Sequence, residues 1–365
     1  MNPTTQRIVI SKKYMSTPFL LYGANGFVGS EVARLAVQIG LQPIIAGRNK
    51  EKLKILSGEL GLEYRVFSLD DAEVIEREIK DMEVVLHCAG PYIYTSKPMV
   101  DTCLKTRTHY LDITGEIPVY EDILSRDAEA KSKGVMLLPG VGFDIVPTDC
   151  LAMHLKQRLP SATHLSLAFH SVGPAGLPPG TQKTMFELIP FGNRVRIEGQ
   201  LKDPGKEVKT RMIDFGEGPV EATRFTWGDV FTAWFSTGIP NIEDYIVLSQ
   251  SMKKGLAFIG VIGPLFKMAA VRNFFKLGVK PGPTPDECKK TVTHVWGEVT
   301  DNSGNKAEVR LYGPEAGLTW TSQTALAAVK KILSGNISPG YQTPAMAFGA
   351  DFVLELEGVT REDIE

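Results

Sequence analysis

The stretch Gly23-Ala24-Asn25-Gly26-Phe27-Val28-Gly29 decides the fold of this 365-residue chain. It follows a short apolar run, residues 19–22, and opens a segment, residues 28–39, whose apolar side chains recur at helical spacing. The first glycine allows a tight turn, the second lets the backbone approach a pyrophosphate, and the third lets the helix pack closely on the strand. Three glycines alone would also suit a structural turn. Their place between a strand and a helix predicts instead that all seven residues bind a dinucleotide at a helix N-terminus.

Apolar runs and helical patterns go on alternating after this loop. Strands are expected at residues 43–46, 64–67, 83–87, 109–111 and 135–138, with helices from 70–71 and over 97–105 and 119–131. Nearly continuous apolar strands of this kind are buried on both faces by helices. The fold class is therefore predicted to be α/β, a Rossmann domain with a doubly wound parallel sheet.

The pattern changes after Asp149. Half-exposed strands are expected at residues 165–170, 208–213, 223–227, 292–300 and 307–311, with a hairpin turn over 301–305 and an amphipathic helix over 321–333. We expect two domains from this change. Residues 1–149 and 321–365 are assigned to the Rossmann domain, and residues 150–320 to an inserted α+β domain for substrate binding or oligomerisation.

Composition excludes several classes of protein. A net charge of −2 leaves no basic footprint for nucleic acid. The four cysteines form no Cys-x-x-Cys pair and have no histidines at metal spacing, so no metal is expected and a reducing compartment is favoured. Residues 1–18 lack the apolar core of a signal peptide. The expected location is the cytoplasm, and the expected partners are a small molecule and, in a homodimer, a second copy of the chain.

One uncharged apolar run, residues 255–266, lies between Lys254 and Lys267. It is too short to span a membrane, which takes roughly 18 residues or more. Two interpretations stay open: a buried or partly buried core segment, or a helix that makes weak contact with a membrane surface.

The end of the second strand predicts which dinucleotide is bound. NAD enzymes usually place a carboxylate there to accept from the ribose hydroxyls, whereas this chain has Arg48 and Asn49. A guanidinium can hold the 2′-phosphate of NADP, although a solvated surface arginine is the ordinary alternative. Asp70, after the third strand, would accept from the adenine amino group or simply cap a helix.

Candidate reacting groups follow the later strands. Cys88, Ala89, Gly90 and Pro91 are expected to border the ribose and nicotinamide, with Cys88 a small buried residue rather than a nucleophile. Tyr92, Glu116 and Asp144 also fall at strand ends and are the catalytic candidates, although each residue type is often structural. No tyrosine has a lysine four residues later, so the acid–base pair of short-chain dehydrogenases is absent.

Several motifs occur together in the order of one known family. They are Gly-Ala-Asn-Gly-Phe-Val-Gly (23–29), Ala-Gly-Arg-Asn (46–49), Cys-Ala-Gly-Pro-Tyr (88–92), His-Tyr-Leu-Asp-Ile-Thr-Gly-Glu (109–116), Gly-Phe-Asp-Ile-Val-Pro-Thr-Asp (142–149) and Pro-Gly-Tyr-Gln-Thr-Pro-Ala-Met-Ala-Phe-Gly (339–349). The chain resembles the saccharopine dehydrogenase-like oxidoreductases, including trans-acting enoyl reductases. The resemblance implies a Rossmann domain with an inserted α/β domain, and NADP(H) bound by residues 23–29 and Arg48. Residues 175–290 contain no motif that is specific to this family.

Three functions follow, in order of preference. The first is an NADP(H)-dependent oxidoreductase that reduces a carbonyl or enoyl group of an apolar or acyl-lipid substrate, for which Phe231, Trp234, Phe235 and residues 255–266 offer an apolar wall. The second is a non-catalytic NADP(H) sensor or regulatory module, and the third a homospermidine-synthase-like reaction. For the enzyme, we expect the second domain to close over the nicotinamide and leave a cleft lined by Tyr92, Glu116 and Asp144.

Overall fold

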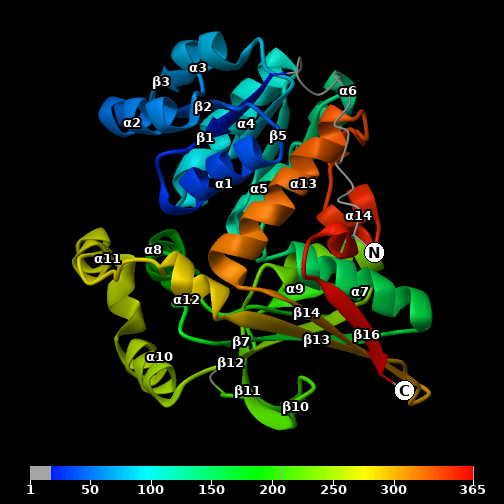
Figure 1. Ribbon diagram of the computed structural model, residues 1–365. Coiled ribbons are helices and arrows are strands. Elements are labelled where there is room, and N and C mark those ends of the chain that lie inside the picture. Colours follow the sequence, from blue (N-terminus) through cyan, green and yellow to red (C-terminus); the bar gives the residue numbers. More distant parts are fainter. Residues whose placement is uncertain (1–17, 206, 365) are drawn as a thin grey trace, which may run out of the picture.

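The chain folds around two β-sheets, which lie one above the other in Figure 1. A computed structural model describes residues 18–205 and 207–364. The N-terminal third builds the upper sheet with its helices, and most of the remaining chain builds the lower one (Figure 1).

The first sheet is parallel throughout, in the order β15-β6-β5-β4-β1-β2-β3. Its strands are β1 (Phe19–Tyr22), β2 (Ile44–Gly47), β3 (Tyr64–Val66), β4 (Val84–His87), β5 (His109–Asp112), β6 (Met136–Leu138) and β15 (Gly340–Tyr341). The accompanying helices are α1 (Phe27–Gln38), α2 (Lys50–Leu60), α3 (Ala72–Ile79), α4 (Tyr92–Thr106), α5 (Ile117–Leu124), α6 (Asp127–Lys133), α13 (Thr321–Leu333) and α14 (Pro344–Phe348). This confirms the predicted Rossmann domain.

The second sheet is mixed, in the order β10-β11-β12-β7-β13-β14-β16, with β8 and β9 added beside β12. Its strands are β7 (His164–Val172), β8 (Val195–Ile197), β9 (Gln200–Lys202), β10 (Thr210–Asp214), β11 (Pro219–Phe225), β12 (Asn241–Val247), β13 (Val292–Thr300), β14 (Lys306–Pro314) and β16 (Thr360–Ile364). Within the described part of this second sheet, only β12 and β7 pair in parallel. A second α+β domain is therefore present, and the turn expected over 301–305 joins β13 to β14.

The second sheet is accompanied by its own helices and short helical turns. They are α7 (Val146–Arg158), α8 (Pro179–Leu188), α9 (Asp229–Thr237), α10 (Gln250–Ile262), α11 (Ala269–Lys276) and α12 (Pro285–Lys289), with short turns η2 (Ile189–Phe191), η3 (Gly263–Lys267), η4 (Ala316–Trp320) and η5 (Phe352–Glu355). The 255–266 run lies in α10 and η3. In the described residues, no helix is long and apolar enough to cross a membrane.

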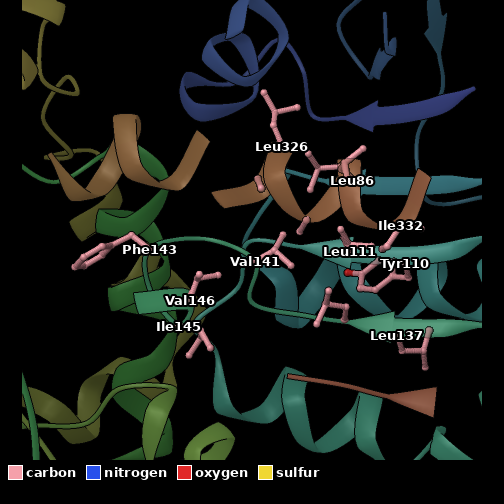
Figure 2. Close-up of a cluster of buried hydrophobic side chains, with 14 of the residues drawn as sticks. Leu86, Tyr110, Leu111, Leu137, Val141, Phe143, Ile145, Val146, Leu326 and Ile332 are labelled. Atoms are coloured by element: carbon pink, nitrogen blue, oxygen red, sulfur yellow. The ribbon is translucent and has the colours of Figure 1, made fainter. Parts of the chain in front are cut away.

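One hydrophobic core connects the two halves. Leu86 and Leu111 of the first sheet face Leu326 and Ile332 of α13, whereas Leu137 points away from that helix (Figure 2). The same core continues through residues 141–146 and takes in one face of the second sheet. Helix α13 also packs on α1 and β4, so it covers part of the first sheet.

Three elements differ from the sequence-based expectations. Strand β16 pairs with β14 at the edge of the second sheet, where its backbone N–H and C=O groups find hydrogen-bond partners. The assignment of all of residues 321–365 to the Rossmann domain is therefore wrong for this last strand. Helix α4 begins at Tyr92 rather than residue 97, because a distant carboxylate accepts from its first N–H groups. The helix expected over 119–131 is two helices, α5 and α6, separated at Ser125 and Arg126.

Candidate functional site

The glycines of the 23–29 loop stand where side chains have no room. Gly23 has a φ of 85°, and a Cβ there would lie 2.7 Å from the carbonyl carbon of Cys88. A Cβ on Gly29 would lie 2.3 Å from the Gly23 carbonyl oxygen. The backbone N–H of Gly23 donates to Ala46 at the end of β2. The loop is thus drawn into the gap between the carboxyl ends of β1, β2 and β4, where Rossmann folds hold the pyrophosphate.

The start of α1 fits an anionic group. Gly26 is its N-cap, so no side chain covers the first N–H groups, and no acidic residue lies in the first turn. Free N–H groups and the positive end of the helix dipole favour phosphate at this position. The glycine cradle and this open helix end are the observations that fit a dinucleotide. Ala24 is buried, while Asn25, Phe27 and Val28 are only half-buried.

Two cationic side chains lie at the end of β2. Arg48 is exposed and makes no ion pair within 18–205 and 207–364. Lys52 lines a cavity of about 160 Å³ together with Asn25 of the loop. Next to Arg48, the Asn49 side chain accepts from the Lys52 N–H and caps α2. This arrangement leaves a guanidinium and an ammonium free to meet a phosphate on the adenosine ribose.

Asp70 lies exposed after β3, and the helix cap is its neighbour Asp71, which accepts from Glu73 and Val74. The Asp70 carboxylate is therefore not used by the helix. Cys88 is half-buried, and burial raises the pKa of its thiol well above the usual value, so it is not a thiolate nucleophile. Ala89 accepts from the Thr95 hydroxyl, and Gly90 and Pro91 lead into α4.

Glu116 anchors the start of α4. Its two carboxylate oxygens accept from the N–H groups of Tyr92, at 2.8 Å, and Ile93, at 2.7 Å. The Thr184 hydroxyl of α8 adds a third contact at 3.3 Å. Glu116 is fully buried, and burial raises its pKa to about 7 against the opposing effect of the two N–H donors. The Tyr92 hydroxyl donates to the His87 carbonyl at 3.2 Å. The side chains of both Tyr92 and Glu116, two of the predicted catalytic residues, are thus hydrogen-bonded to backbone groups.

Asp144 is in a different position. Burial alone raises the pKa of its carboxyl to about 7, and among the described residues no group donates a hydrogen bond to that carboxyl. The carboxyl lies against Gly115, where an added Cβ would be 3.1 Å from Oδ2. The indole N–H of Trp227, in the second domain, donates to the Asp144 backbone carbonyl at 2.8 Å. The backbone of Asp144 is therefore held by Trp227, while its side chain is a free carboxyl whose pKa is raised by burial.

The structure brings Tyr92, Glu116 and Asp144 together at the strand ends, with the second domain contacting them through Thr184 and Trp227. The two described cavities are not lined by these three residues. The smaller is the one beside Asn25, and the larger, about 480 Å³, lies among α1, α12, β13 and β14. The aromatic residues suggested as an apolar wall lie elsewhere: Phe231 is buried against Tyr120, because α9 points it into the core.

Several further residues of this region were not among the predicted site residues, although Asp112 is also expected from the sequence to lie near a strand end. Asp112 is buried and accepts from Tyr110, Thr114 and Gly140, which ties the loops after β5 and β6 together. His87 is fully buried, and burial lowers its pKa to about 3, so it stays neutral. Thr184 and Trp227 lie in the part of the chain where the family motifs are absent. Only the position of Asp112 and His87 at strand ends could have drawn attention to them.

The comparisons with known proteins agree with this geometry. Residues 19–138 match the family described as saccharopine dehydrogenase NADP binding domain. A human protein named saccharopine dehydrogenase-like oxidoreductase is 27% identical, over 92% of this chain and 94% of its own length. A Mycobacterium leprae protein named trans-acting enoyl reductase is 32% identical, over 38% of this chain and 35% of its own.

The fold is also that of a solved structure. Apo saccharopine dehydrogenase (L-Glu forming) from Saccharomyces cerevisiae superposes with a TM-score of 0.66 at 12% identity, covering 96% of this chain and 100% of that one. Together with the glycine cradle and the open end of α1, these matches identify the nucleotide-binding half. Residues 19–138 match the saccharopine dehydrogenase NADP binding domain, and the cofactor is NADP, in a chain that is similar over most of its length to a saccharopine dehydrogenase-like oxidoreductase.

Proposed function

We propose that this chain is an NADPH-dependent reductase of a carbonyl or enoyl group on an apolar, acyl-type substrate, with Asp144 as the proton donor. The observation that carries the proposal is the free Asp144 carboxyl at the strand ends, with a pKa raised to about 7. An acid works best when its pKa lies near the working pH, because it then holds a proton and also releases it readily.

The surroundings of Asp144 support an apolar substrate. Rings of the second domain lie next to it: Trp227 contacts Asp144 through its indole N–H and packs on Phe169 and Phe225, at ring-centre distances of 5.4 and 5.7 Å. All three rings are only half-buried. Half-exposed aromatic rings beside a few polar groups are typical of sites that bind apolar small molecules.

Each residue then has a distinct role. A bound NADPH supplies hydride to the substrate carbon. Asp144 donates the proton that completes the reduction, to the oxygen of a carbonyl or the carbon next to the carbonyl of an enoyl group. Glu116 is a positioning residue, since it touches the start of α4 and not the substrate. The Tyr92 hydroxyl is held by His87 and is not needed as a donor.

The test is turnover of a panel of 2-enoyl and keto acyl thioesters, followed by the loss of NADPH absorbance. For the wild-type chain, kcat should fall about tenfold per pH unit above pH of about 7, where Asp144 loses its proton. Asp144→Asn should lower kcat by about 10²- to 10⁴-fold, remove that pH dependence and leave the Kd for NADPH unchanged.

Tyr92→Phe is the matched comparison, since it removes one hydroxyl from the same site. It should keep most of the turnover. Loss of turnover in Tyr92→Phe with an unaffected Asp144→Asn would make Tyr92 the donor. Tight NADPH binding with no turnover of any substrate would favour the NADP(H) sensor over the enzyme.

A further inference from the structure

The segment between Asp244 and Asp286 is basic and apolar. Its 41 residues contain no Asp or Glu and six basic residues, Lys253, Lys254, Lys267, Arg272, Lys276 and Lys280. The segment forms α10, η3 and α11, which lie at the outer edge of the second domain (Figure 1). A run of this composition is unusual on a chain whose net charge is −2.

Helix α11 is oriented with its charges inward. Arg272 donates to the Glu187 carboxylate of α8 at 2.8 Å, and Lys276 pairs with the same carboxylate. The Tyr94 hydroxyl of α4 adds a third donor at 2.7 Å. The Glu187 side chain is buried, with an exposed fraction of only 3%. These contacts fix the rotation of α11, so its outward side chains are held there by structure.

The outward side chains are apolar. Phe274 is 69% exposed and Leu277, three residues later on the same face, is 84% exposed. Leu265 and Met268 before α11 and Phe258 in α10 are also more than half exposed. The core needs none of these five, because Phe186, Phe266 and Phe275 pack together underneath. We call the five residues the α10–α11 apolar surface. Large exposed apolar side chains in successive elements of one segment are a feature of interaction sites.

The charges around this surface select the partner. Lys254, Lys267 and Lys280 are exposed and form no ion pair within the described chain, whereas Lys253 pairs with Glu221. Each helix is too short to span a bilayer. Exposed apolar side chains and unpaired lysines within one helical segment are typical of helices that lie in the interface of an anionic membrane.

We propose that the α10–α11 apolar surface docks on an anionic phospholipid membrane, with Phe274 and Leu277 inserted among the acyl chains and Lys254 and Lys267 over the headgroups. The proposal does not depend on the reductase activity. It commits to lipid rather than to protein because the exposed lysines of residues 245–285 have no acidic residue within that segment to pair with, whereas a self-complementary dimer face would need charges of both signs.

The test is sedimentation of the full chain with vesicles of phosphatidylcholine alone or mixed with phosphatidylglycerol. We expect binding to the mixed vesicles that weakens as salt is raised. The double variant Phe274→Glu with Leu277→Glu should lower vesicle affinity by at least tenfold, and Lys254→Glu with Lys267→Glu by about fivefold for each lysine.

The matched control is Val208→Glu with Met212→Glu, because both are exposed apolar residues, one just before β10 and one in it, outside both the α10–α11 apolar surface and the nucleotide-binding half. It should bind vesicles like the wild type. All variants change exposed residues, and unaltered NADPH binding shows that each is folded. Absence of wild-type binding to mixed vesicles, or equal binding by the Phe274–Leu277 variant and the control, overturns the proposal. A dimer in solution that the Phe274–Leu277 variant splits, without vesicle binding, makes this face an interface between copies instead.

Discussion

We propose that Arg48 selects NADP(H) over NAD(H). It is exposed at the end of β2, where a carboxylate would serve NAD, and it has no ion-pair partner in the described chain. A guanidinium–phosphate contact is worth about 1.5–3 kcal/mol, on the order of ten- to a hundredfold in affinity.

Arg48→Ala is therefore expected to weaken NADP(H) by that factor and NAD(H) much less, in titrations at fixed ionic strength. Rising salt should weaken NADP(H) binding to the wild type as well. Lys52 at the neighbouring cavity would reduce the size of the effect without changing its direction. Arg77→Ala, an exposed arginine of α3, is the control. Equal wild-type affinity for NAD(H) and NADP(H) would contradict this assignment.

At the scale of the element, α4 depends on a residue outside itself. Its first two N–H groups donate to the buried Glu116 carboxylate, and the N-cap Pro91 has no side chain that could replace it. Glu116→Gln leaves one N–H facing an amide group that cannot accept. We expect the free energy of unfolding to fall by about 1–3 kcal/mol, measured by urea denaturation.

Glu121→Gln, an exposed change on the neighbouring α5, should leave the stability within about 0.5 kcal/mol of the wild type. A positioning role for Glu116 also requires that Glu116→Gln keep the pH dependence that Asp144 imposes on kcat. Loss of that dependence with unchanged stability would make Glu116 itself the titrating acid.

At the scale of the whole molecule, buried acids set the pH dependence of stability. Burial raises the pKa of Asp112 to about 6 and of Glu116 and Asp144 to about 7. Burial also raises the pKa of Asp229 and Asp244, and each of the pair lies far from solvent. The folded chain therefore keeps protons that the unfolded chain has lost by a pH of about 5. Its free energy of unfolding must fall as the pH rises through these values.

We expect lower stability at a pH of about 8 than at about 6.5, by up to 1.4 kcal/mol per pH unit for each proton kept, in urea denaturation. Histidines with lowered pKa, such as His87, act in the other direction only below a pH of about 6.5, where the unfolded chain takes up the proton. Asp244→Asn should reduce the dependence of the free energy of unfolding on pH, whereas Asp286→Asn, a change of an exposed residue, should leave it unchanged. A stability that rises over this interval would show that the buried acids are ionised.

The sequence by itself determined the nucleotide-binding half. Glycines at 23, 26 and 29, apolar strands and helical spacing are local patterns, because a turn, a strand face and a helix face each depend on residues only a few positions apart. These patterns predicted the parallel sheet and the phosphate loop. The hairpin over 301–305 was equally local.

Only the tertiary structure decided the rest, because it depends on residues that meet from distant parts of the chain. Helix α4 begins at Tyr92 since Glu116 reaches it from 24 positions away. β16 joins the second sheet because β14, about 50 residues earlier, offers a free edge. Glu116 and Asp144 are both acids at strand ends, and they differ in their contacts: two backbone N–H groups donate to the Glu116 carboxylate, whereas the Asp144 carboxyl is free. Burial raises the pKa of both carboxyls, and residue type alone cannot indicate this. Phe274 faces outward because Glu187 holds the opposite side of α11.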